Sequence, residues 1–169
     1  MTKKVSSWHI GVAAEAFAAG LFARCGLDVS VQYGADQPEY DLIIAQGDKL
    51  LKVSVKGSQD GGWGLTQNYK KDTDYHGAAD AWMKRYNKKT VLCFVQFKGV
   101  RIVELPRVYL ATPKEVATHL KSTAKGRGGT ILEEYKKWTS RAFGAGTEDK
   151  IPDSWVFSLE RIEELLAEV

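Results

Sequence analysis

The chain has 169 residues, of which 44% are hydrophobic, so it is long enough to bury a core, and we expect residues 1–169 to form a single domain. No run approaches a membrane span of about 18 apolar residues, and the basic start is not followed by the apolar segment of a signal peptide. These features argue against a membrane or secreted protein, and we expect a cytoplasmic one.

The net charge of +3 says little about partners, but the charges are unevenly distributed. Between Lys49 and Arg101, eleven basic residues accompany four acidic ones. Such an excess suits a surface that binds phosphate groups, although the solvated flank of a helix produces it too. Cys25 and Cys93 lie in apolar segments without the spacing of a zinc site, so we expect both to be buried free thiols.

The first predicted element is a helix that begins near Trp8, capped by Ser6 or Ser7, and ends at Gly26. Residues 12–23 are apolar almost all round, which predicts a helix that is buried on most sides. Small side chains would let this helix pack close to a sheet. They are Ala14, Ala18 and Ala19.

Glu15 is the only acidic residue of this helix. An ionised carboxylate in apolar surroundings is costly unless a positive charge meets it. One interpretation is that Glu15 forms a salt bridge to Arg24 or Lys56, or a polar contact at a solvent-exposed end of the helix. The functional interpretation is that Glu15 and Asp41 converge on one metal ion.

After a strand over residues 29–33, residues 38–56 predict a β-hairpin with a type II′ turn at Gly47 and Asp48. Counting from the turn pairs Gln46 with Lys49 and places Asp41 opposite Ser54. One face is apolar: Tyr40, Leu42, Ile44, Leu51, Val53 and Val55. The other face is polar: Glu39, Asp41, Lys52, Ser54 and Lys56.

The polar face of the hairpin has two interpretations. Its carboxylates could hold a divalent cation while Lys56 lies beside an activated water. The ordinary alternative is an exposed cross-strand ion pair between Glu39 and Lys56.

Residues 57–67 form a Gly-rich segment in which Trp63 either stacks on a nucleic-acid base or caps the core. Residues 67–87 predict a helix with an inward stripe: Ala78, Ala79, Ala81, Trp82 and Tyr86. Its outer residues could line a nucleic-acid duplex. With Trp63, the candidate nucleic-acid contacts are Gln67, Lys70, Lys71, Lys84 and Arg85.

The rest of the chain continues the alternation of strands and helices. We expect strands over residues 90–97 and 100–105, and a helix from Pro113 to about Ser122 that Thr112 caps. Residues 125–129 predict a basic turn, either a phosphate contact or a plain surface loop. Residues 132–138 are ambiguous, and Ser158 caps a last amphipathic helix over residues 159–169.

The order of these motifs resembles the PD-(D/E)XK nuclease superfamily, in particular Holliday-junction resolvases and restriction-like or intron-encoded endonucleases. The resemblance lies in Gly11-x-x-Ala14-Glu15 on the first helix, in Pro38-x-x-Asp41 opening an apolar strand, and in the second strand that ends in Val55-Lys56. It covers roughly residues 8–56. It implies a restriction-endonuclease-like α/β core, with a central mixed sheet of four or five strands flanked by helices.

By position, the resemblance implies that Glu15 assists a metal, that Asp41 is its principal ligand, and that Lys56 orients or activates the water. Ser54 departs from the pattern, because the family usually has an acidic residue there and a neutral hydroxyl is a weak Mg²⁺ ligand. Two alternatives remain. Either Glu39 supplies the missing carboxylate, or Glu15, Asp41, the carbonyl of residue 55 and waters suffice, with Ser54 as a subsidiary ligand or water partner.

The resulting hypothesis is a Mg²⁺- or Mn²⁺-dependent endonuclease that hydrolyses double-stranded or branched DNA, and cutting both strands would favour a homodimer. The alternative is a nuclease-fold protein that has lost catalysis and binds nucleic acid or another protein. A third hypothesis is a protein-interaction domain for which neither DNA nor metal matters.

Overall fold

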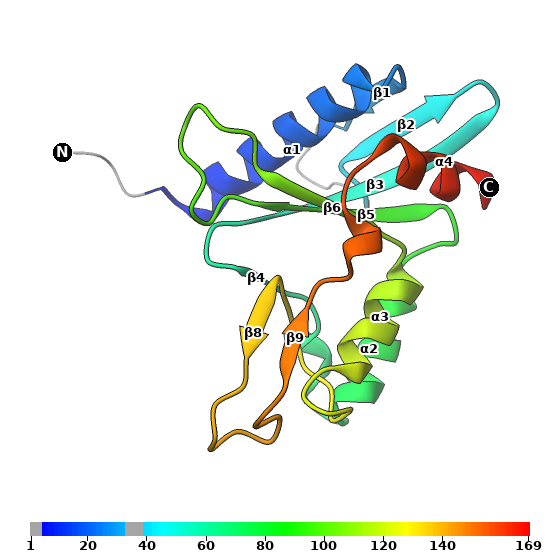
Figure 1. Ribbon diagram of the computed structural model, residues 1–169. Helices are drawn as coiled ribbons and strands as arrows, with labels where there is room; N and C mark the ends of the chain where they lie inside the picture. The colour runs from blue at the N-terminus through cyan, green and yellow to red at the C-terminus, as the bar shows by residue number, and fades with distance from the viewer. Residues whose placement is uncertain (1–4, 33–38) are drawn as a thin grey trace.

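The computed structural model describes residues 5–32 and 39–169, and a five-stranded mixed sheet lies at its centre (Figure 1). The order of the strands is β1-β2-β3-β5-β6, and only the β3–β5 pair is parallel. This sheet confirms the predicted α/β class. The strands are β1 (Asp28–Val31), β2 (Leu42–Gln46), β3 (Lys49–Ser58), β5 (Thr90–Gln96) and β6 (Arg107–Ala111).

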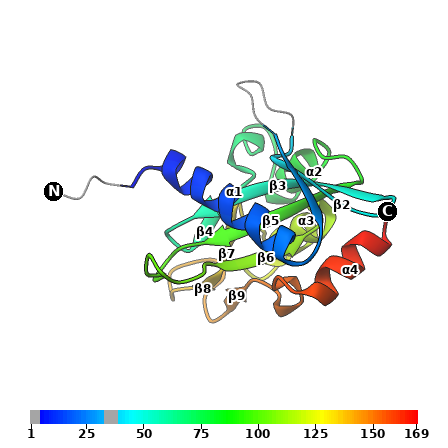
Figure 2. The same cartoon turned by 90° about the horizontal axis from the view of Figure 1, so that it is seen from above.

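Helices cover both faces of the sheet (Figure 2). Helices α1 (Ser7–Arg24) and α4 (Leu159–Ala167) pack on one face, whereas α2 (Tyr75–Met83) and α3 (Pro113–Ser122) pack on the other. No helix within the described ranges is long and apolar enough to cross a membrane.

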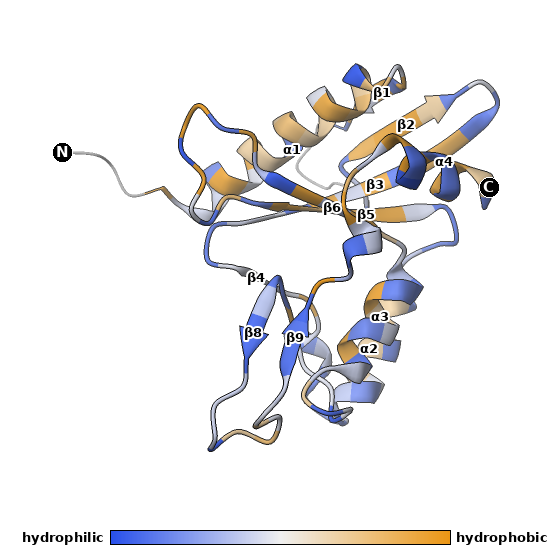
Figure 3. Cartoon of the chain, viewed as in Figure 1, coloured by the Kyte–Doolittle hydropathy of each residue, from blue (hydrophilic) through white to orange (hydrophobic). Residues whose placement is uncertain are grey.

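Two small antiparallel pairs of strands extend the structure below the central sheet in Figure 1. Strand β4 (Gly62–Gly64) pairs with β7 (Ile131–Glu133), and β8 (Tyr135–Lys137) pairs with β9 (Glu148–Lys150). The β8–β9 hairpin projects away from the sheet, and the residues of its two strands are hydrophilic (Figure 3). Two 3₁₀ helices, η1 (Gln67–Tyr69) and η2 (Asp153–Trp155), complete the elements.

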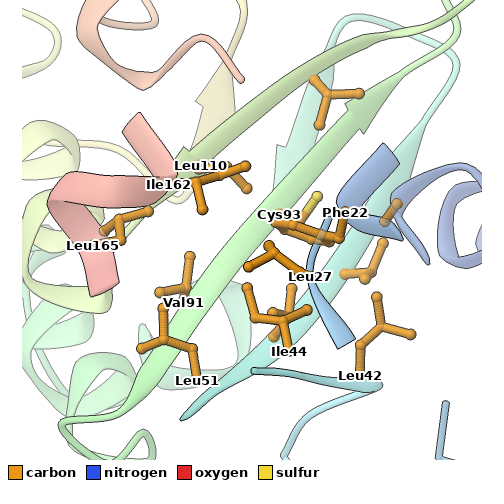
Figure 4. Packing of buried hydrophobic residues seen from close by; sticks show 14 of the residues in the cluster. Phe22, Leu27, Leu42, Ile44, Leu51, Val91, Cys93, Leu110, Ile162 and Leu165 are labelled. Atoms are coloured by element: carbon orange, nitrogen blue, oxygen red, sulfur yellow. The ribbon is translucent and has the colours of Figure 1, made fainter. Parts of the chain in front are cut away.

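The β2–β3 hairpin has the register that the sequence predicts. Leu42 pairs with Val53, and Gln46 pairs with Lys49. Gly47 has a φ of +58°, whereas Asp48 does not adopt a positive φ, which is the φ pattern of a type II′ turn. The apolar face of the hairpin is therefore buried under α1, as Figure 4 shows for part of this core.

Helix α1 lies close to strand β3 because small residues meet at the crossing. The Ala14 side chain is fully buried, and a Cβ atom added to Gly57 would lie 2.8 Å from the Ile10 backbone oxygen and 2.9 Å from the Ala14 Cβ. The ends of the helix match the prediction, since Ser6 caps it and Gly26 follows it with a φ of +80°.

The predicted helix over residues 67–87 is wrong in its extent. Its helical part is α2 alone, which begins after Asp74, whose side chain accepts a hydrogen bond from the Gly77 N–H at 2.7 Å. Short polar side chains favour caps and turns over helix interiors, so Asp74 starts a new helix instead of continuing one. Ala81, predicted to face inward, is exposed.

The predicted strand over residues 100–105 is also wrong. Two tight turns occupy this segment, closed by hydrogen bonds from Val100 N–H to Phe97 O and from Glu104 N–H to Arg101 O, both 3.0 Å. The strand β6 that pairs with β5 begins only at Arg107. The β-branched residues of the segment have no neighbouring strand to pair with, and Ile102 is 100% exposed.

The predictions for the last two helices are confirmed. Thr112 and Glu115 form a reciprocal capping box at the start of α3, and Ser158 caps α4. The buried Arg161 of α4 ties the two helices together through hydrogen bonds of 2.6 and 2.7 Å to the Glu115 carboxylate.

Gly57→Ala tests the close approach of α1 and β3. We expect it to lower the free energy of unfolding by about 1–3 kcal/mol, because the new methyl group would meet a backbone oxygen and a buried methyl group. Gly20→Ala is the matched control on α1, where an added Cβ meets nothing within 4 Å, and should raise stability by about 0.4–1 kcal/mol. Urea unfolding measures both, and equal stability of Gly57→Ala and wild type would contradict the close approach.

Candidate functional site

The candidate site lies where strand β2 ends and its partner β3 continues. The β2–β3 pairing stops at Leu42 and Val53, whereas β3 runs on to Ser58. Beyond that point the Val55 N–H of β3 is bound by a side chain instead of by the β2 backbone. It donates a hydrogen bond of 2.6 Å to the Asp41 Oδ2. This bond holds the Asp41 side chain beside the end of β3.

Glu15 of α1, Asp41, and Lys56 of β3 interact electrostatically at this point. Burial raises the pKa of Glu15, the negative charge of Asp41 raises it further, and the Lys56 ammonium opposes both effects. Two acids from distant parts of the chain therefore share one partly desolvated environment.

The pKa of Lys56 is shifted in the opposite direction, downwards, in the same environment. Burial lowers the pKa of Lys56, and the nearby Arg85 guanidinium lowers it too. Asp41 and Glu15 oppose these effects and favour the ammonium form. Arg85, predicted as a nucleic-acid contact, thus lies close to Lys56.

None of the three simple ion pairs considered from the sequence, Glu15–Arg24, Glu15–Lys56 and Glu39–Lys56, is present among the described residues. Within residues 5–32 and 39–169, no salt bridge of 4.0 Å or less involves Glu15, Glu39, Asp41 or Lys56. The two acids thus repel each other without a directly paired basic side chain.

The donor set suits a divalent cation through two carboxylates and not three. In the described part of the chain, no three His, Cys, Asp or Glu side chains are grouped so that they could hold a metal ion. The structure therefore does not assemble Glu39 with Glu15 and Asp41 as a three-carboxylate site, and Glu39 is exposed just before β2. Two carboxylates completed by water are a normal Mg²⁺ environment.

Ser54 is only 1% exposed and is hydrogen-bonded to Tyr86, an interaction that lowers the pKa of the Tyr86 phenol against the larger, raising effect of burial. This contact favours Ser54 as a hydrogen-bonding partner over Ser54 as a metal ligand. Tyr86 was predicted only as part of a buried helix stripe. Its position over Ser54 depends on how the end of α2 packs on β3, which no sequence motif indicates.

A cavity of about 320 Å³ opens beside Lys56, between the start of α1 and the segment that connects β3 to β4. Trp63 lines it but is only 4% exposed, and its Nε1–H donates to the Lys56 backbone oxygen at 2.9 Å. Trp63 also packs edge-on against Phe94 and Tyr109. The prediction that an exposed Trp63 stacks on a base is therefore wrong, and the alternative that it caps the core is correct.

The other predicted nucleic-acid contacts lie at both ends of α2. Gln67, Lys71 and Lys84 are exposed, and Lys70 is half-buried with its Nζ 4.7 Å from the centre of the Tyr75 ring. Arg85 is exposed at the end of α2 that faces the candidate site. The predicted contacts therefore do not form one continuous cluster, and Arg85 is the member that lies near Lys56.

Comparison with known proteins supports the fold. No family model matches the chain, and no curated protein matches it in sequence. Six solved chains match it in structure, among them that of a bacterial homing endonuclease, I-Ssp6803I. The TM-score is 0.51 at 14% sequence identity, and the match covers 97% of this chain and 95% of that chain. The chain thus has a nuclease-like fold.

Glu15→Gln tests the electrostatic strain of the site. The folded-state pKa of Glu15 is raised, so its ionised form destabilises the folded protein at neutral pH, and this effect disappears as the carboxyl group is protonated at lower pH. In EDTA at pH 8 we therefore expect Glu15→Gln to have a higher Tm than wild type, with the difference shrinking towards pH 4. Glu163→Gln on the exposed side of α4 is the control, and a lower Tm for Glu15→Gln at pH 8 would contradict the assignment.

Proposed function

We propose that this protein is a metal-dependent endonuclease of the PD-(D/E)XK type that hydrolyses DNA phosphodiester bonds, with residues 1–169 acting as one domain. The observation that carries the proposal is the partly desolvated acid pair of Glu15 and Asp41 beside Lys56. Perturbed acids and bases that share one environment beside a cavity are typical of catalytic sites. The nuclease-like fold supports the same function.

Glu15 and Asp41 would hold Mg²⁺ or Mn²⁺, with the Val55 carbonyl and water as further ligands. The metal would lower the pKa of a bound water and neutralise charge on the phosphate. The electrostatics of the chain fit this role, because burial and the charge of Asp41 both raise the pKa of Glu15 and a bound dication would offset both effects. The Val55 N–H keeps the Asp41 carboxylate in a fixed orientation.

Lys56 is the residue that acts on the reacting groups. Its ammonium donates hydrogen bonds to the attacking water and to a phosphate oxygen, and it stabilises the negative charge that develops as the phosphodiester bond breaks. Burial lowers the pKa of Lys56, and the negative charges of Asp41 and Glu15 oppose this effect and favour the ammonium form. The Trp63 indole N–H holds the backbone oxygen of Lys56, so Trp63 has a structural role in positioning the lysine.

DNA would approach the site from the cavity beside Lys56, with Arg85 on one side of the phosphate backbone. Double-stranded or branched DNA fits the exposed basic groups at the ends of α2, since such groups contact phosphates without reading sequence. Cleavage of both strands of a duplex would require two such sites, which a homodimer provides.

Cleavage of supercoiled plasmid tests this function. We expect wild type to nick or linearise the plasmid in Mg²⁺ or Mn²⁺ and to be inactive in EDTA. Asp41→Ala and Lys56→Ala should reduce the rate by about 10²–10⁴-fold, since each removes a group that acts in the transition state. Lys49→Ala, at the opposite end of β3, is the control and should keep the wild-type rate. Inactive wild type, or activity that survives both site substitutions, refutes the proposal.

Ser54 supports a second candidate function, a nuclease-fold protein that binds nucleic acid or a protein without catalysis. Ser54 occupies the position at which the superfamily usually has an acid, and its hydroxyl is buried against Tyr86. A site with one carboxylate fewer binds a divalent cation less tightly.

A metal titration separates the two functions. For the nuclease we expect the Tm to rise as Mn²⁺ is added, because binding to the folded state alone stabilises it, and we expect Asp41→Asn to abolish the rise. The catalytically inactive protein should show no rise, and its affinity for DNA should not depend on the metal. Differential scanning fluorimetry over a Mn²⁺ series, with Glu163→Gln as the control variant, gives the answer.

A further inference from the structure

Basic and aromatic side chains alternate on a surface at the base of the β8–β9 hairpin, far from Glu15 in sequence. Three segments contribute to it: the chain around the start of α2, the loop between α3 and β7, and the hairpin itself. We call this set the basic–aromatic ladder. Its members are Lys70, Tyr75, Arg127, Trp138, Phe143 and Lys136.

The contacts along the ladder are continuous. Lys70 Nζ lies 4.7 Å from the centre of the Tyr75 ring, and the Arg127 guanidinium carbon lies 4.9 Å from the same ring. The Arg127 guanidinium also lies 5.6 Å from the Trp138 ring. At the far end, Lys136 Nζ lies 4.2 Å from the Trp138 ring. Such cation–π contacts hold long basic side chains in fixed orientations.

The hairpin is built to hold this arrangement. Asp149 Oδ2 accepts hydrogen bonds from Trp138 Nε1–H at 2.5 Å and from the Ala124 N–H at 3.0 Å, which fixes the ring and the loop that carries Arg127. A Cβ atom added to Gly144 would come within 2.8 Å of the Trp138 ring, so only glycine fits there. These contacts position the cations.

The loop of the hairpin is basic, and acids flank it: Glu133 pairs with Lys136 at 3.1 Å and Glu148 pairs with Lys137 at 4.0 Å. Residues 135–147 include Lys136, Lys137 and Arg141 and no acidic residue. Of the neighbouring acids, Glu134 is bound to Arg107 at 2.6 Å, on the side of the central sheet. The Nη groups of Arg127 have no hydrogen-bond partner among the residues that the structure describes, so they remain available to an anionic ligand.

The ladder is connected to the candidate site. Strand β4, which lines the cavity beside Lys56, pairs with β7, and β7 leads through Glu134 into β8 (Figure 1). The Glu134 N–H donates to the Gly61 backbone oxygen at 2.9 Å, which anchors the base of the hairpin to the wall of the cavity. The wall of the cavity and the base of the hairpin are therefore joined by paired backbone segments.

We infer that the basic–aromatic ladder and the β8–β9 hairpin bind the sugar–phosphate backbone of duplex DNA. This inference rests on the proposed function for its choice of polyanion. The rings of Tyr75 and Trp138 are each flanked by two cations, which leaves little of either ring for stacking on unpaired bases. The basic groups contact phosphates and the binding is therefore independent of sequence.

The experiment measures binding of the full-length chain to a fluorescein-labelled DNA duplex by anisotropy, in EDTA and over a potassium chloride series. Lys70→Ala, Arg127→Gln and Lys136→Ala together should raise Kd by about tenfold or more. They should also reduce the slope of log K against log salt by about 2 to 3, because each lost phosphate contact removes about 0.9. An unchanged Kd and slope overturn the inference.

The matched control is the triple variant Lys49→Ala, Arg24→Gln and Lys114→Ala, which removes the same charge from exposed positions at the start of β3, the end of α1 and the start of α3. We expect little change in Kd or slope. An effect equal to that of the ladder variant overturns the inference, because net charge alone would then explain the binding. Tighter binding of an RNA duplex of the same sequence overturns the assignment to DNA.

Loss of Arg127 could unfold the hairpin, so a second variant keeps the test decisive. Lys137→Ala with Arg141→Ala removes two exposed charges of the hairpin and leaves the ladder intact, and the salt slope should still fall. An unchanged slope for this variant overturns the role of the hairpin.

Since binding is measured without metal, wild type that binds through the ladder but never cuts DNA refutes only the proposed activity. Cleavage together with unaffected binding by the ladder variant refutes only this inference.

Discussion

The close contact between helix α1 and strand β3 is the constraint on which the candidate site depends. Gly57 has no side chain to separate the strand from Ile10 and Ala14, so α1 lies low over the sheet. Glu15, the next residue after Ala14, thereby reaches the open edge of β3 beside Asp41 and Lys56. A larger residue at the crossing would lift the helix and leave the hairpin with an ordinary polar face.

This contact places charges where they are unfavourable for stability. Glu15 loses solvent and gains the repulsion of Asp41, and Lys56 is buried beside the charge of Arg85. Proteins keep such groups at sites whose function needs them, and the surrounding fold stabilises them. Here the Val55 N–H fixes Asp41, and the Trp63 indole fixes the backbone of Lys56. In the proposed nuclease, the two acids would bind a cation and Lys56 would bind a phosphate, and both ligands would relieve the unfavourable electrostatics of the site.

The elements that the sequence predicted correctly are those whose signals are local. Ser6, Thr112 and Ser158 cap helices because a side-chain oxygen reaches an N–H two or three residues away, whatever the rest of the chain does. The β2–β3 register follows from the turn at Gly47 by counting. The prediction of a strand over residues 100–105 is wrong because β-propensity alone does not supply a partner strand. The sequence left two interpretations of Trp63 open because loop composition does not reveal whether a side chain is buried.

The sequence by itself determined the α/β class, the hairpin with its polar face, and the candidacy of Glu15, Asp41 and Lys56, since alternation, capping and motif order are properties of short segments. Only the tertiary structure decided that these three residues interact, that Ser54 is buried against Tyr86, and that three distant segments build the basic–aromatic ladder. These outcomes depend on the distance between packed elements. The alanines of α1 predicted a close approach to the sheet, but which residue they meet there, Gly57, depends on the packing of distant segments and is not encoded in local pattern.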